Sequence, residues 1–342
     1  MDSIINFYEN KNIKSKKYYI DGQLNSENDK PASIKYYPSE SGEIGNIKYE
    51  RYYLNGKLHR ENDKPAVIRY YKNGNIYSEE FYLNDKYHRE NDKPAKIEYY
   101  ENGNVKSEIY YINGDVHRDN DKGAEIYYYE NGNIKSEEYY IYGQRYREND
   151  KPAIIHYYLS DSSEIGNKKY ERYYLDGQYH RETDNPAYVE YYANGNIKFE
   201  EYYVYGELYR DDKPAEIYYY ENGNIEFERY YIDRKQHREN DKPAVIHYYP
   251  SEIGKIGNIE CEEYYIDHEL HRDNDKPALI YYYENGNIKS EEYYIDGELR
   301  RVNPDCPTTI EYKNDGNDIV NIFTDEDGKE LKREEIFGVW NK

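Results

Sequence analysis

The sequence has few of the residues that fill a conventional core or form common reactive sites. Its 342 residues include only 2 Cys, 1 Met, 1 Trp and 6 Phe. Cys261 and Cys306 lie far apart in the chain and form neither a disulfide framework nor a set of metal ligands, so we expect two free thiols. No run of about 18 apolar residues occurs, so no transmembrane segment is expected. The start, MDSIINFYENKN, lacks the apolar stretch of a secretory signal.

Basic residues are also in the minority. Lys and Arg number 47 against 69 Asp and Glu, which gives a net charge of -22. Nucleic acids and anionic membranes require a basic surface, so the charge argues against both as partners. High charge and low hydrophobicity are typical of disorder, but disordered chains are poor in aromatic residues. Here 52 Tyr recur in phase along the chain, which indicates an ordered repeat.

The dominant feature is a unit of about 29 residues that recurs along the chain. The segment 99–127 reads YYENGNVKSEIYYINGDVHRDNDKGAEIY, and 128–156 repeats it closely. Units begin near residues 7, 36, 70, 99, 128, 157, 191, 219, 248 and 282. Such a unit can bury apolar groups only against its neighbours. We therefore predict one array over residues 1–311 and a C-terminal capping hairpin or hairpins over 312–342.

Each unit has the pattern of a β-hairpin. Alternation of Ala95, Ile97 and Tyr99 with variable residues predicts a half-buried strand. Asn-Gly at Gly103 predicts a two-residue type I′ turn, in which both residues have positive φ. A second strand is expected over 105–112, then a second turn at 113–114 and a short third strand near 116–118. An Asp-x-Pro sequence ends most units, and there we expect the Asp side chain to cap its own turn.

These patterns predict an all-β protein with an elongated antiparallel β-meander or open β-solenoid. Residues 329–337 could form a short helix, but we favour a last hairpin with its turn at Asp327-Gly328. That hairpin, together with Trp340, would seal the open end of the sheet.

Tyrosine recurs at the same positions in most units, as at Tyr99, Tyr100, Tyr110 and Tyr111. A tyrosine ring buries apolar area in a thin sheet while its hydroxyl stays hydrated or hydrogen-bonded. An aromatic surface that stacks sugars, bases or prolines is the functional alternative. Because the positions repeat throughout the array, we interpret them as structural.

Charged side chains recur as well. A metal site at the repeated His117-Arg118 is disfavoured because equivalent His residues should lie about 10 Å apart, two strand spacings. Glu137 and its equivalents should form a Glu–Arg or Glu–Tyr ladder. The loop around Asp121 lacks the central Gly and closing Glu of an EF-hand. We therefore predict no catalytic residue, no metal and no cofactor.

The sequence feature that most strongly suggests a function is the departure of three units from the regular repeat. Three units lengthen the first turn to PSESGEIGN (38–46), LSDSSEIGN (159–167) and PSEIGKIGN (250–258). Neutral drift or duplication of a larger block would explain them as well as a shared partner would. The candidate partner-contact residues in these loops are Pro38, Glu43, Ile44, Leu159, Glu164, Ile165, Pro250, Ile253 and Ile256.

Over about residues 7–311 the unit YYxNGxxxxExYYxxGxxHRxxDKPA resembles the MORN-type repeat and its bacterial antitoxin-like relatives. The form with His-Arg and Pro-Ala is most similar to repeat proteins of giant amoebal viruses (mimivirus-type) and of phages. MORN units are shorter and carry Gly where Arg follows His here. The resemblance implies tandem hairpins and a role in scaffolding, membrane-proximal attachment or toxin neutralisation.

From these observations we expect a non-enzymatic repeat scaffold that binds a protein whose identity the sequence does not give. One alternative is a ligand-binding array, since the YY-x-x-G spacing is similar to that of choline- and glucan-binding repeats. Those repeats use Trp cages, whereas the single Trp340 lies outside the array. A second alternative is an acidic, antitoxin-like inhibitor. The expected location is intracellular, in a host cytoplasm or a virion if the protein is viral.

Overall fold

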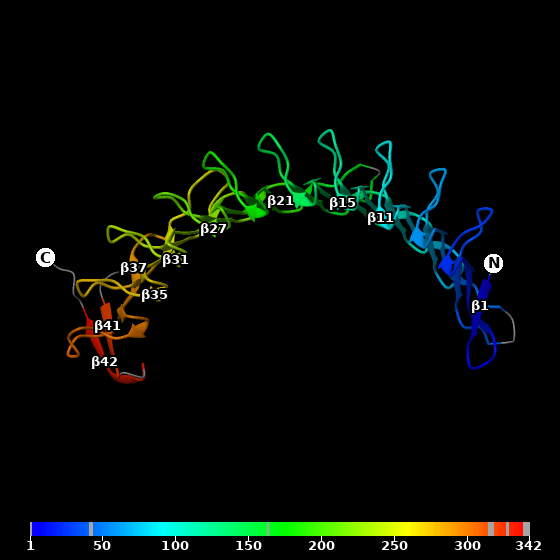
Figure 1. The fold of residues 1–342 in the computed structure, drawn as a ribbon. Helices are drawn as coiled ribbons and strands as arrows, with labels where there is room; N and C mark the ends of the chain where they lie inside the picture. Colours follow the sequence, from blue (N-terminus) through cyan, green and yellow to red (C-terminus); the bar gives the residue numbers. More distant parts are fainter. Residues whose placement is uncertain (1, 41–43, 163, 314–317, 326–327, 338–342) are drawn as a thin grey trace. The chain divides into compact units, whose positions relative to one another are not determined.

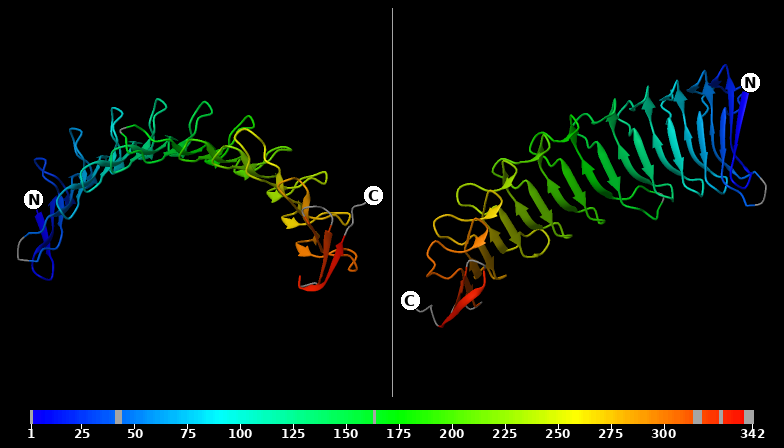
Figure 2. Two further views of the ribbon diagram at one scale, coloured as in Figure 1. Left: turned by 180° about the vertical axis from the view of Figure 1, so that it is seen from behind. Right: turned by 60° about the horizontal axis from the view of Figure 1, so that its bottom comes forward.

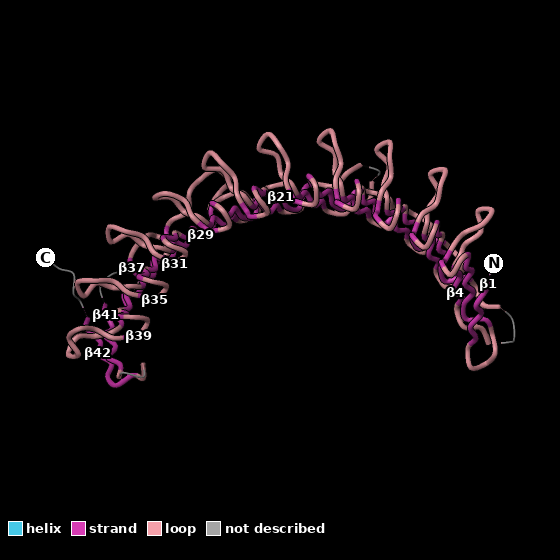
Figure 3. The backbone as a smooth tube through the Cα atoms, in the orientation of Figure 1, coloured by secondary structure: helices cyan, strands magenta, loops and turns pink. Residues whose placement is uncertain are grey.

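The computed structural model describes residues 2–40, 44–162, 164–313, 318–325 and 328–337, and these residues form strands and loops without a helix (Figure 3). They make up two compact units, residues 1–177 and 178–342.

The N-terminal unit is an antiparallel meander in which each long strand pairs with the next along the chain (Figure 1). Its long strands are β1 (Asp2–Phe7), β2 (Ile13–Ile20), β4 (Ser33–Tyr36), β5 (Ile47–Arg51), β8 (Val67–Tyr70), β9 (Ile76–Glu80), β12 (Lys96–Tyr99), β13 (Val105–Ile109), β16 (Glu125–Tyr128), β17 (Ile134–Glu138), β20 (Ile154–Tyr157) and β21 (Lys168–Arg172). Its short strands are β3 (Gln23–Leu24), β6 (Tyr53–Leu54), β7 (Lys57–Leu58), β10 (Tyr82–Leu83), β11 (Lys86–Tyr87), β14 (Tyr111–Ile112), β15 (Asp115–Val116), β18 (Tyr140–Ile141), β19 (Gln144–Arg145) and β22 (Tyr174–Leu175).

The C-terminal unit has the same organisation. Its long strands are β24 (Tyr188–Tyr191), β25 (Ile197–Glu201), β28 (Glu216–Tyr219), β29 (Ile225–Arg229), β32 (Val245–Tyr248), β33 (Ile259–Glu263), β36 (Leu279–Tyr282), β37 (Ile288–Glu292), β40 (Thr309–Tyr312), β41 (Asp318–Thr324) and β42 (Glu330–Phe337). Its short strands are β23 (Gln178–Tyr179), β26 (Tyr203–Val204), β27 (Glu207–Leu208), β30 (Tyr231–Ile232), β31 (Lys235–Gln236), β34 (Tyr265–Ile266), β35 (Glu269–Leu270), β38 (Tyr294–Ile295) and β39 (Glu298–Leu299).

The predicted fold class is confirmed: the chain is an all-β array of hairpin repeats. Among the described strands of either unit, no pairing joins the first strand to the last, so neither meander closes into a barrel. The short hairpins lie along one edge of the long strands (Figure 2). The predicted C-terminal hairpin is also present as β41–β42, with β42 exposed along most of its length. Asp327 and Trp340 lie outside the described residues.

The first turn of the repeat differs from the predicted type I′ turn. Tyr100 N–H donates to Asn104 O at 2.8 Å, and Gly103 N–H donates to Tyr100 O at 3.0 Å, so three residues form the loop. Within this described turn only Gly103 has positive φ, at 92°. The Asn102 side chain instead accepts from Asn104 N–H at 2.9 Å. The prediction failed because the Asn stabilises this turn through its side chain, which is typical of a type I turn followed by Gly.

The second turn is the predicted two-residue turn. Asn113 and Gly114 have φ values of 54° and 99°, and they join β14 to β15. The predicted strand 105–112 is divided at Tyr110, because this residue bonds in two directions. Its N–H donates to Ala124 O in the long ladder at 2.8 Å, and its C=O accepts from His117 N–H in the short hairpin at 3.1 Å. The ring of Tyr110 is thereby held in the interior, 7% exposed.

The core is a narrow row of small and aromatic residues rather than a deep centre. In most repeats one Ala is fully buried, and the aromatic residue whose backbone N–H bonds to its C=O is nearly so, as with Ala124 at 0% and Tyr110 at 7% exposure. Other buried pairs of this kind are Ala66 with Tyr52, Ala95 with Phe81, Ala215 with Tyr202, Ala244 with Tyr230 and Ala278 with Tyr264. Alanine is required where the neighbouring ring covers the strand closely.

Successive repeats are joined by side chains as well as by the strand ladder. The Tyr100 hydroxyl donates to Tyr128 O of the next repeat at 2.8 Å, and Asn104 Nδ2 donates to Glu130 O at 2.8 Å. The tyrosine bond recurs in both units, at Tyr8–Tyr36, Tyr37–Tyr70, Tyr71–Tyr99, Tyr129–Tyr157, Tyr192–Tyr219, Tyr220–Tyr248, Tyr249–Tyr282 and Tyr283–Tyr312. Tyrosine therefore has the structural role that its periodicity predicted.

The Glu–Tyr ladder is also present. Tyr157 hydroxyl donates to Glu137 Oε2 at 2.9 Å, again between neighbouring repeats. Burial and the charge of Glu137 both raise the pKa of Tyr157. The same bond joins Tyr70–Glu50, Tyr99–Glu79, Tyr128–Glu108, Tyr219–Glu200, Tyr248–Glu228, Tyr282–Glu262 and Tyr312–Glu291.

Replacing Glu137 by Ala should lower the free energy of unfolding by about 1–3 kcal/mol, because the half-buried Tyr157 hydroxyl loses its acceptor. Urea unfolding followed by circular dichroism measures the change. Glu137→Gln keeps an acceptor at the same place and should cost clearly less. Equal stability of the Ala variant and the original chain would show that this ladder contributes nothing.

Candidate functional site

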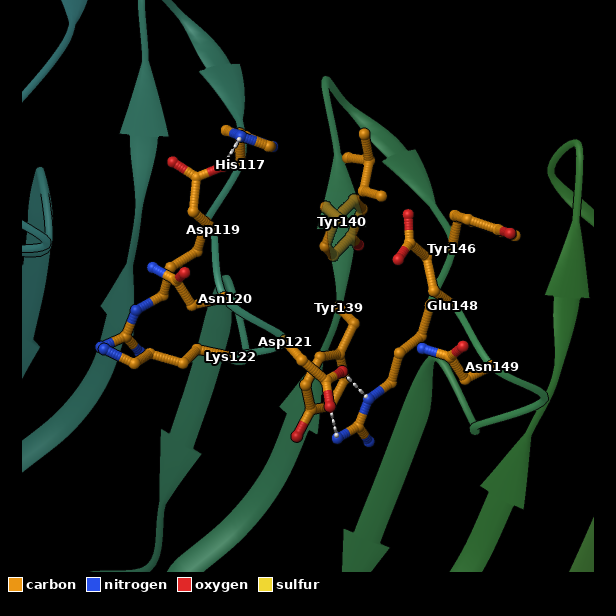
Figure 4. Close-up of a pocket in the computed structure, with 13 residues that line it drawn as sticks. His117, Asp119, Asn120, Asp121, Lys122, Tyr139, Tyr140, Tyr146, Glu148 and Asn149 are labelled. Atoms are coloured by element: carbon orange, nitrogen blue, oxygen red, sulfur yellow. Dashed lines mark hydrogen bonds and ion pairs between the residues drawn. The ribbon is translucent and has the colours of Figure 1, made fainter.

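A cluster of charged side chains joins a repeat to the one before it at several places in both units. Arg118 Nε donates to Asp92 Oδ1 at 2.6 Å, and Lys122 Nζ donates to Asp92 Oδ2 at 2.5 Å. The Arg118 guanidinium lies 3.6 Å from the centre of the buried Tyr110 ring and also donates to Gly123 O at 3.1 Å. We call this cluster of Asp, Arg, Lys and ring the inter-repeat joint (Figure 4 shows the next one, at Asp121 beside Tyr139).

The joint recurs with nearly the same geometry. The pairs are Asp29–Arg60, Asp63–Arg89, Asp92–Arg118, Asp121–Arg147, Asp184–Arg210, Asp241–Arg272 and Asp275–Arg301. At the Arg position the first repeat has Ser26. Because these pairs recur, the Arg of His-Arg and the Asp of Asp-x-Pro are the two sides of one contact between repeats.

This contact corrects two predictions. The Asp was expected to cap its own turn, and the Arg was considered as a partner of Glu. The Asp92 carboxylate is instead used by Arg118 and Lys122, which lie 26 and 30 residues further along the chain. The signal was present in the sequence, since Arg and Asp-Lys recur together. The sequence alone did not show that an Asp pairs with the Arg of the following unit, because this pairing depends on how the hairpins stack.

The loop that carries the Asp is a tight left-handed turn. Asn120 and Asp121 have φ values of 62° and 55°, and the equivalent pairs have similar values. Asn and Asp tolerate this region better than other non-glycine residues. The Glu/Asp-Asn-Asp-Lys sequence is therefore explained by turn geometry and by the joint, without a bound cation.

The recurring His residues pack against the neighbouring short hairpin. The His117 ring stacks on Tyr142 at 4.4 Å between centroids, and its Nδ1 accepts from Tyr142 N–H at 3.4 Å. His180 contacts Tyr205 in the same way. Among the described residues, no group of three or more His, Cys, Asp or Glu is arranged to hold a metal ion.

Shallow hollows lie between successive joints. One of them, about 360 Å³, is lined by His117–Lys122 of one repeat and by Tyr139–Ile141 and Tyr146–Asn149 of the next. Equivalent hollows lie at His88, Tyr209, His237 and His271. These hollows are lined by corresponding positions of the repeat, with Tyr209 in one of them where the others have a His.

The variable positions of the long strands carry a row of aromatic rings in the C-terminal unit. Tyr188, Phe199, Tyr218, Phe227 and His247 follow one another across β24, β25, β28, β29 and β32, with ring centroids 4.1–5.2 Å apart. Part of each ring remains accessible. The sequence predicted that variable face positions could differ in function, but not that these rings would stack.

The three long loops are fixed at their bases by hydrogen bonds from Asn side chains of the preceding repeat. Asn224 Nδ2 donates to Ser251 O at 2.9 Å, to Ser251 Oγ at 2.8 Å and to Glu252 O at 2.8 Å, and Asn224 Oδ1 accepts from Gly254 N–H at 3.1 Å. Asn12 and Asn133 hold the other two loops through Ser39 and Ser160.

Each loop ends in Ile-Gly-Asn, in which the Gly and the Asn have structural roles and the Ile is exposed to solvent. A Cβ on Gly45, Gly166 or Gly257 would lie about 2 Å from a backbone carbonyl oxygen, so only Gly fits there. The Asn that follows accepts the hydrogen bond that closes each loop. The isoleucine before the Gly is solvent-exposed in each loop: Ile44 is 56%, Ile165 53% and Ile256 79% exposed.

The other predicted contact residues are exposed as well. Leu159 and Ile253 are 57% and 80% exposed, and Pro38, Glu164 and Pro250 are also at the surface. Glu43 lies outside the described residues. The role of these residues in binding a partner stays a prediction.

Two further features are the cysteine thiols and the absence of a membrane-spanning helix among the described residues. Cys261 is a buried free thiol, whose pKa is raised by burial, and Cys306 is a partly exposed free thiol. In the part of the chain that the structure describes, no helix has the length and apolar character needed to cross a bilayer.

Comparison with known families identifies the hairpins. The MORN repeat variant matches residues 66–84, 96–113, 122–142, 187–205, 215–233 and 279–296. These segments contain the long strands and the first turn, whereas Arg118, Asp121 and most equivalent joint residues lie between them. The likeness to viral and phage proteins is not tested by these matches and stays a prediction.

Comparisons with curated proteins and with solved structures do not add a family assignment. No curated protein matches the sequence. Among solved structures, "Crystal Structure of TcdB2-TccC3-TEV" is 11% identical over 99% of this chain, with a TM-score of 0.16. A Photorhabdus luminescens Tc holotoxin pore is 10% identical over 98% of this chain, with a TM-score of 0.15. The chain spans about a fifth of those chains, 20% and 21%.

The joint predicts a dependence of stability on acid pH. Hydrogen bonds from Arg118 and then Lys122 lower the pKa of Asp92 to about 2, and Asp63, Asp121 and Asp241 have the same shift from their own partners. In the unfolded chain an Asp pKa is about 3.9. The joints therefore stabilise the fold fully above pH about 4 and lose this contribution as pH falls through about 2.

Urea unfolding between pH 5 and 2 should show this loss, and the double variant Asp92→Asn and Asp121→Asn should show a shallower loss than the original chain. Glu148→Gln changes an exposed carboxylate outside the joint and should leave the pH dependence unaltered. Parallel pH curves for the double variant and the original chain would contradict the assignment.

Proposed function

Since the chain is a MORN-like tandem β-hairpin repeat protein, we propose that it is a non-enzymatic scaffold that binds another protein through its three long loops. The observation that carries the proposal is the exposed isoleucine before the required Gly of each loop. Gly257 and Asn258 have structural reasons for their identity, whereas Ile256 is 79% exposed. In an ordinary repeat, Ile76 and Ile288 are each only 37% exposed.

The loops have the properties of a preformed binding surface. Anchored bases reduce the conformational entropy that a loop loses when it binds. An isolated exposed aliphatic residue is common at protein surfaces, but the same residue at the same place in three loops supports a shared use. Apolar tips on an acidic, hydrophilic chain also favour a partner with apolar contact sites.

Spacing supports a partner that engages more than one loop. The loops at 38–46 and 159–167 both connect equivalent strands of the N-terminal unit, so they lie on the same edge of its meander. Eight strand steps separate β4 from β20, which corresponds to about 38 Å along the ladder. Two weak contacts at fixed separation on one partner bind more tightly than either alone.

The ligand-binding alternative has one observation in its favour, the row of stacked rings from Tyr188 to His247. Exposed ring faces bind sugars and quaternary ammonium groups. Titration with glycans or choline, followed by tyrosine fluorescence, separates this function from protein binding. The antitoxin-like alternative would require a basic protein among the captured partners, because the chain carries a net charge of -22.

The proposal also keeps the intracellular location, in a host cytoplasm or virion if the protein is viral. A free, buried thiol at Cys261 is compatible with a reducing compartment.

Replacing Ile44, Ile165 and Ile256 together by Ser should abolish capture of the protein partner and leave the melting temperature unchanged. The measurement is cross-linking and mass spectrometry in the source cells, with the original chain in parallel. As a matched control, Ile76→Ser with Ile288→Ser changes isoleucines of ordinary repeats and should retain capture. A partner that binds the triple variant as well as the original chain would contradict the role of the loops.

A further inference from the structure

One joint of the C-terminal unit lacks its carboxylate. The loop from Arg210 to Pro214 reads RDDKP, one residue shorter than Arg272 to Pro277, RDNDKP. Asp212 therefore follows Arg210 by two residues instead of three. The Asn-Asp pair with two left-handed residues is lost, and within this described loop only Asp212 has positive φ, at 47°.

The shortened loop directs Asp212 away from its joint. Its side chain is 73% exposed, against 41% for the paired Asp241. The remaining contact is a 3.5 Å approach of Lys242 Nζ to Asp212 Oδ1. Arg238 makes no ion pair with Asp212, and its buried Nε has no hydrogen-bond partner among the described residues.

The rest of this joint is in place. The Arg238 guanidinium lies 3.7 Å from the centre of the Tyr230 ring, as Arg272 lies 3.6 Å from Tyr264. One terminal nitrogen of Arg238 donates to Pro243 O at 3.5 Å. The guanidinium is therefore held in the orientation that binds a carboxylate in the other joints, with its Nε donor unused.

A hollow of about 320 Å³ lies at this joint, lined by 209–213 of one repeat and by 230–232 and 237–240 of the next. Its acidic lining residues are Asp211, Asp212 and Glu239. In the complete joint at Asp241, Arg272 Nε binds Oδ1 at 2.7 Å and Lys276 Nζ binds Oδ2 at 2.5 Å. Arg238 lines this hollow with its Nε unpaired, and Lys242 approaches only the exposed Asp212 carboxylate, at 3.5 Å.

We propose that Arg238 and Lys242 form a binding site for one carboxylate group that is supplied from outside the joint. The carboxylate would occupy the place that Asp241 has in the neighbouring joint, with one oxygen on Arg238 Nε and the other on Lys242 Nζ. Charge-assisted bonds of this kind are stronger than neutral ones, and the planar guanidinium selects the planar carboxylate. The net charge of -22 opposes the approach of an anion, but exposed charges beyond about 10 Å are largely screened at 0.1 M salt.

Two sources offer the same chemistry: an acidic side chain of a protein, or a small free carboxylic acid. The site depends on Arg238 and Lys242 and not on the three long loops, so its failure and the failure of the scaffold proposal can be told apart. The loop variant described above should keep the carboxylate site intact.

The test follows the Arg Nε–H signals by NMR in the full chain during titration with sodium acetate, against sodium chloride at equal ionic strength. The Arg238 signal should shift and saturate, whereas the signal of Arg272, already paired with Asp241, should not. Insertion of Asn between Asp211 and Asp212 restores the length of the loop. That variant should melt at a higher temperature and lose the acetate response, because its own Asp fills the site.

Lys242→Met provides a second variant, since Lys242 is 43% exposed and its loss should not prevent folding. It should weaken acetate binding. A capped peptide with one Glu, and the same peptide with Gln, identify the source. Tighter binding of the Glu peptide than of acetate assigns the site to a protein side chain, and equal binding assigns it to free acids. No saturable shift of Arg238 with either probe, or an equal shift in the insertion variant, would overturn the proposal.

Discussion

In the complete joints, the Arg guanidinium lies on an aromatic ring of its own repeat and binds the Asp of the repeat before it. At Arg118 these contacts are Tyr110 at 3.6 Å and Asp92 at 2.6 Å. A hairpin with such a thin core has little buried area of its own, so its stability depends on the interface with its neighbour. Each partly exposed ion pair contributes about 0.2–1 kcal/mol, and each stacked guanidinium about 0.5–1 kcal/mol. Small contributions suffice because they recur at successive joints.

The joint also explains why so much of the sequence is conserved from unit to unit. Asn and Asp provide the left-handed turn, Lys and Arg bind the carboxylate, and the ring supports the guanidinium. Residues that would suggest chemistry in a single-site protein are therefore occupied by contacts between repeats. What distinguishes one repeat from another is the remainder: the three long loops, the row of rings in the C-terminal unit and the joint at Arg238 whose carboxylate is turned away.

The strands and the role of tyrosine were predictable from the sequence, because alternation and periodic spacing are local properties. The second turn was also predictable, since Asn113 and Gly114 join two short strands directly and both have positive φ. The first turn was not. The same Asn-Gly pair there forms a three-residue loop, since the side chain of Asn102 competes for a backbone N–H. The Asp of Asp-x-Pro was misread for a similar reason: a local bond was assumed where a distant partner binds more strongly.

The sequence by itself determined the repeat, its strands, the positions of its turns and the places where the repeat is interrupted. These follow from φ preferences and side-chain alternation, which depend on covalent neighbours. Only the tertiary structure decided which side chains of neighbouring repeats meet. Asp92 and Arg118 are 26 residues apart and come together only when the hairpins stack. For the same reason, the residue missing before Asp212 is visible in the sequence, but its consequence for Arg238 appears only where the two repeats face each other.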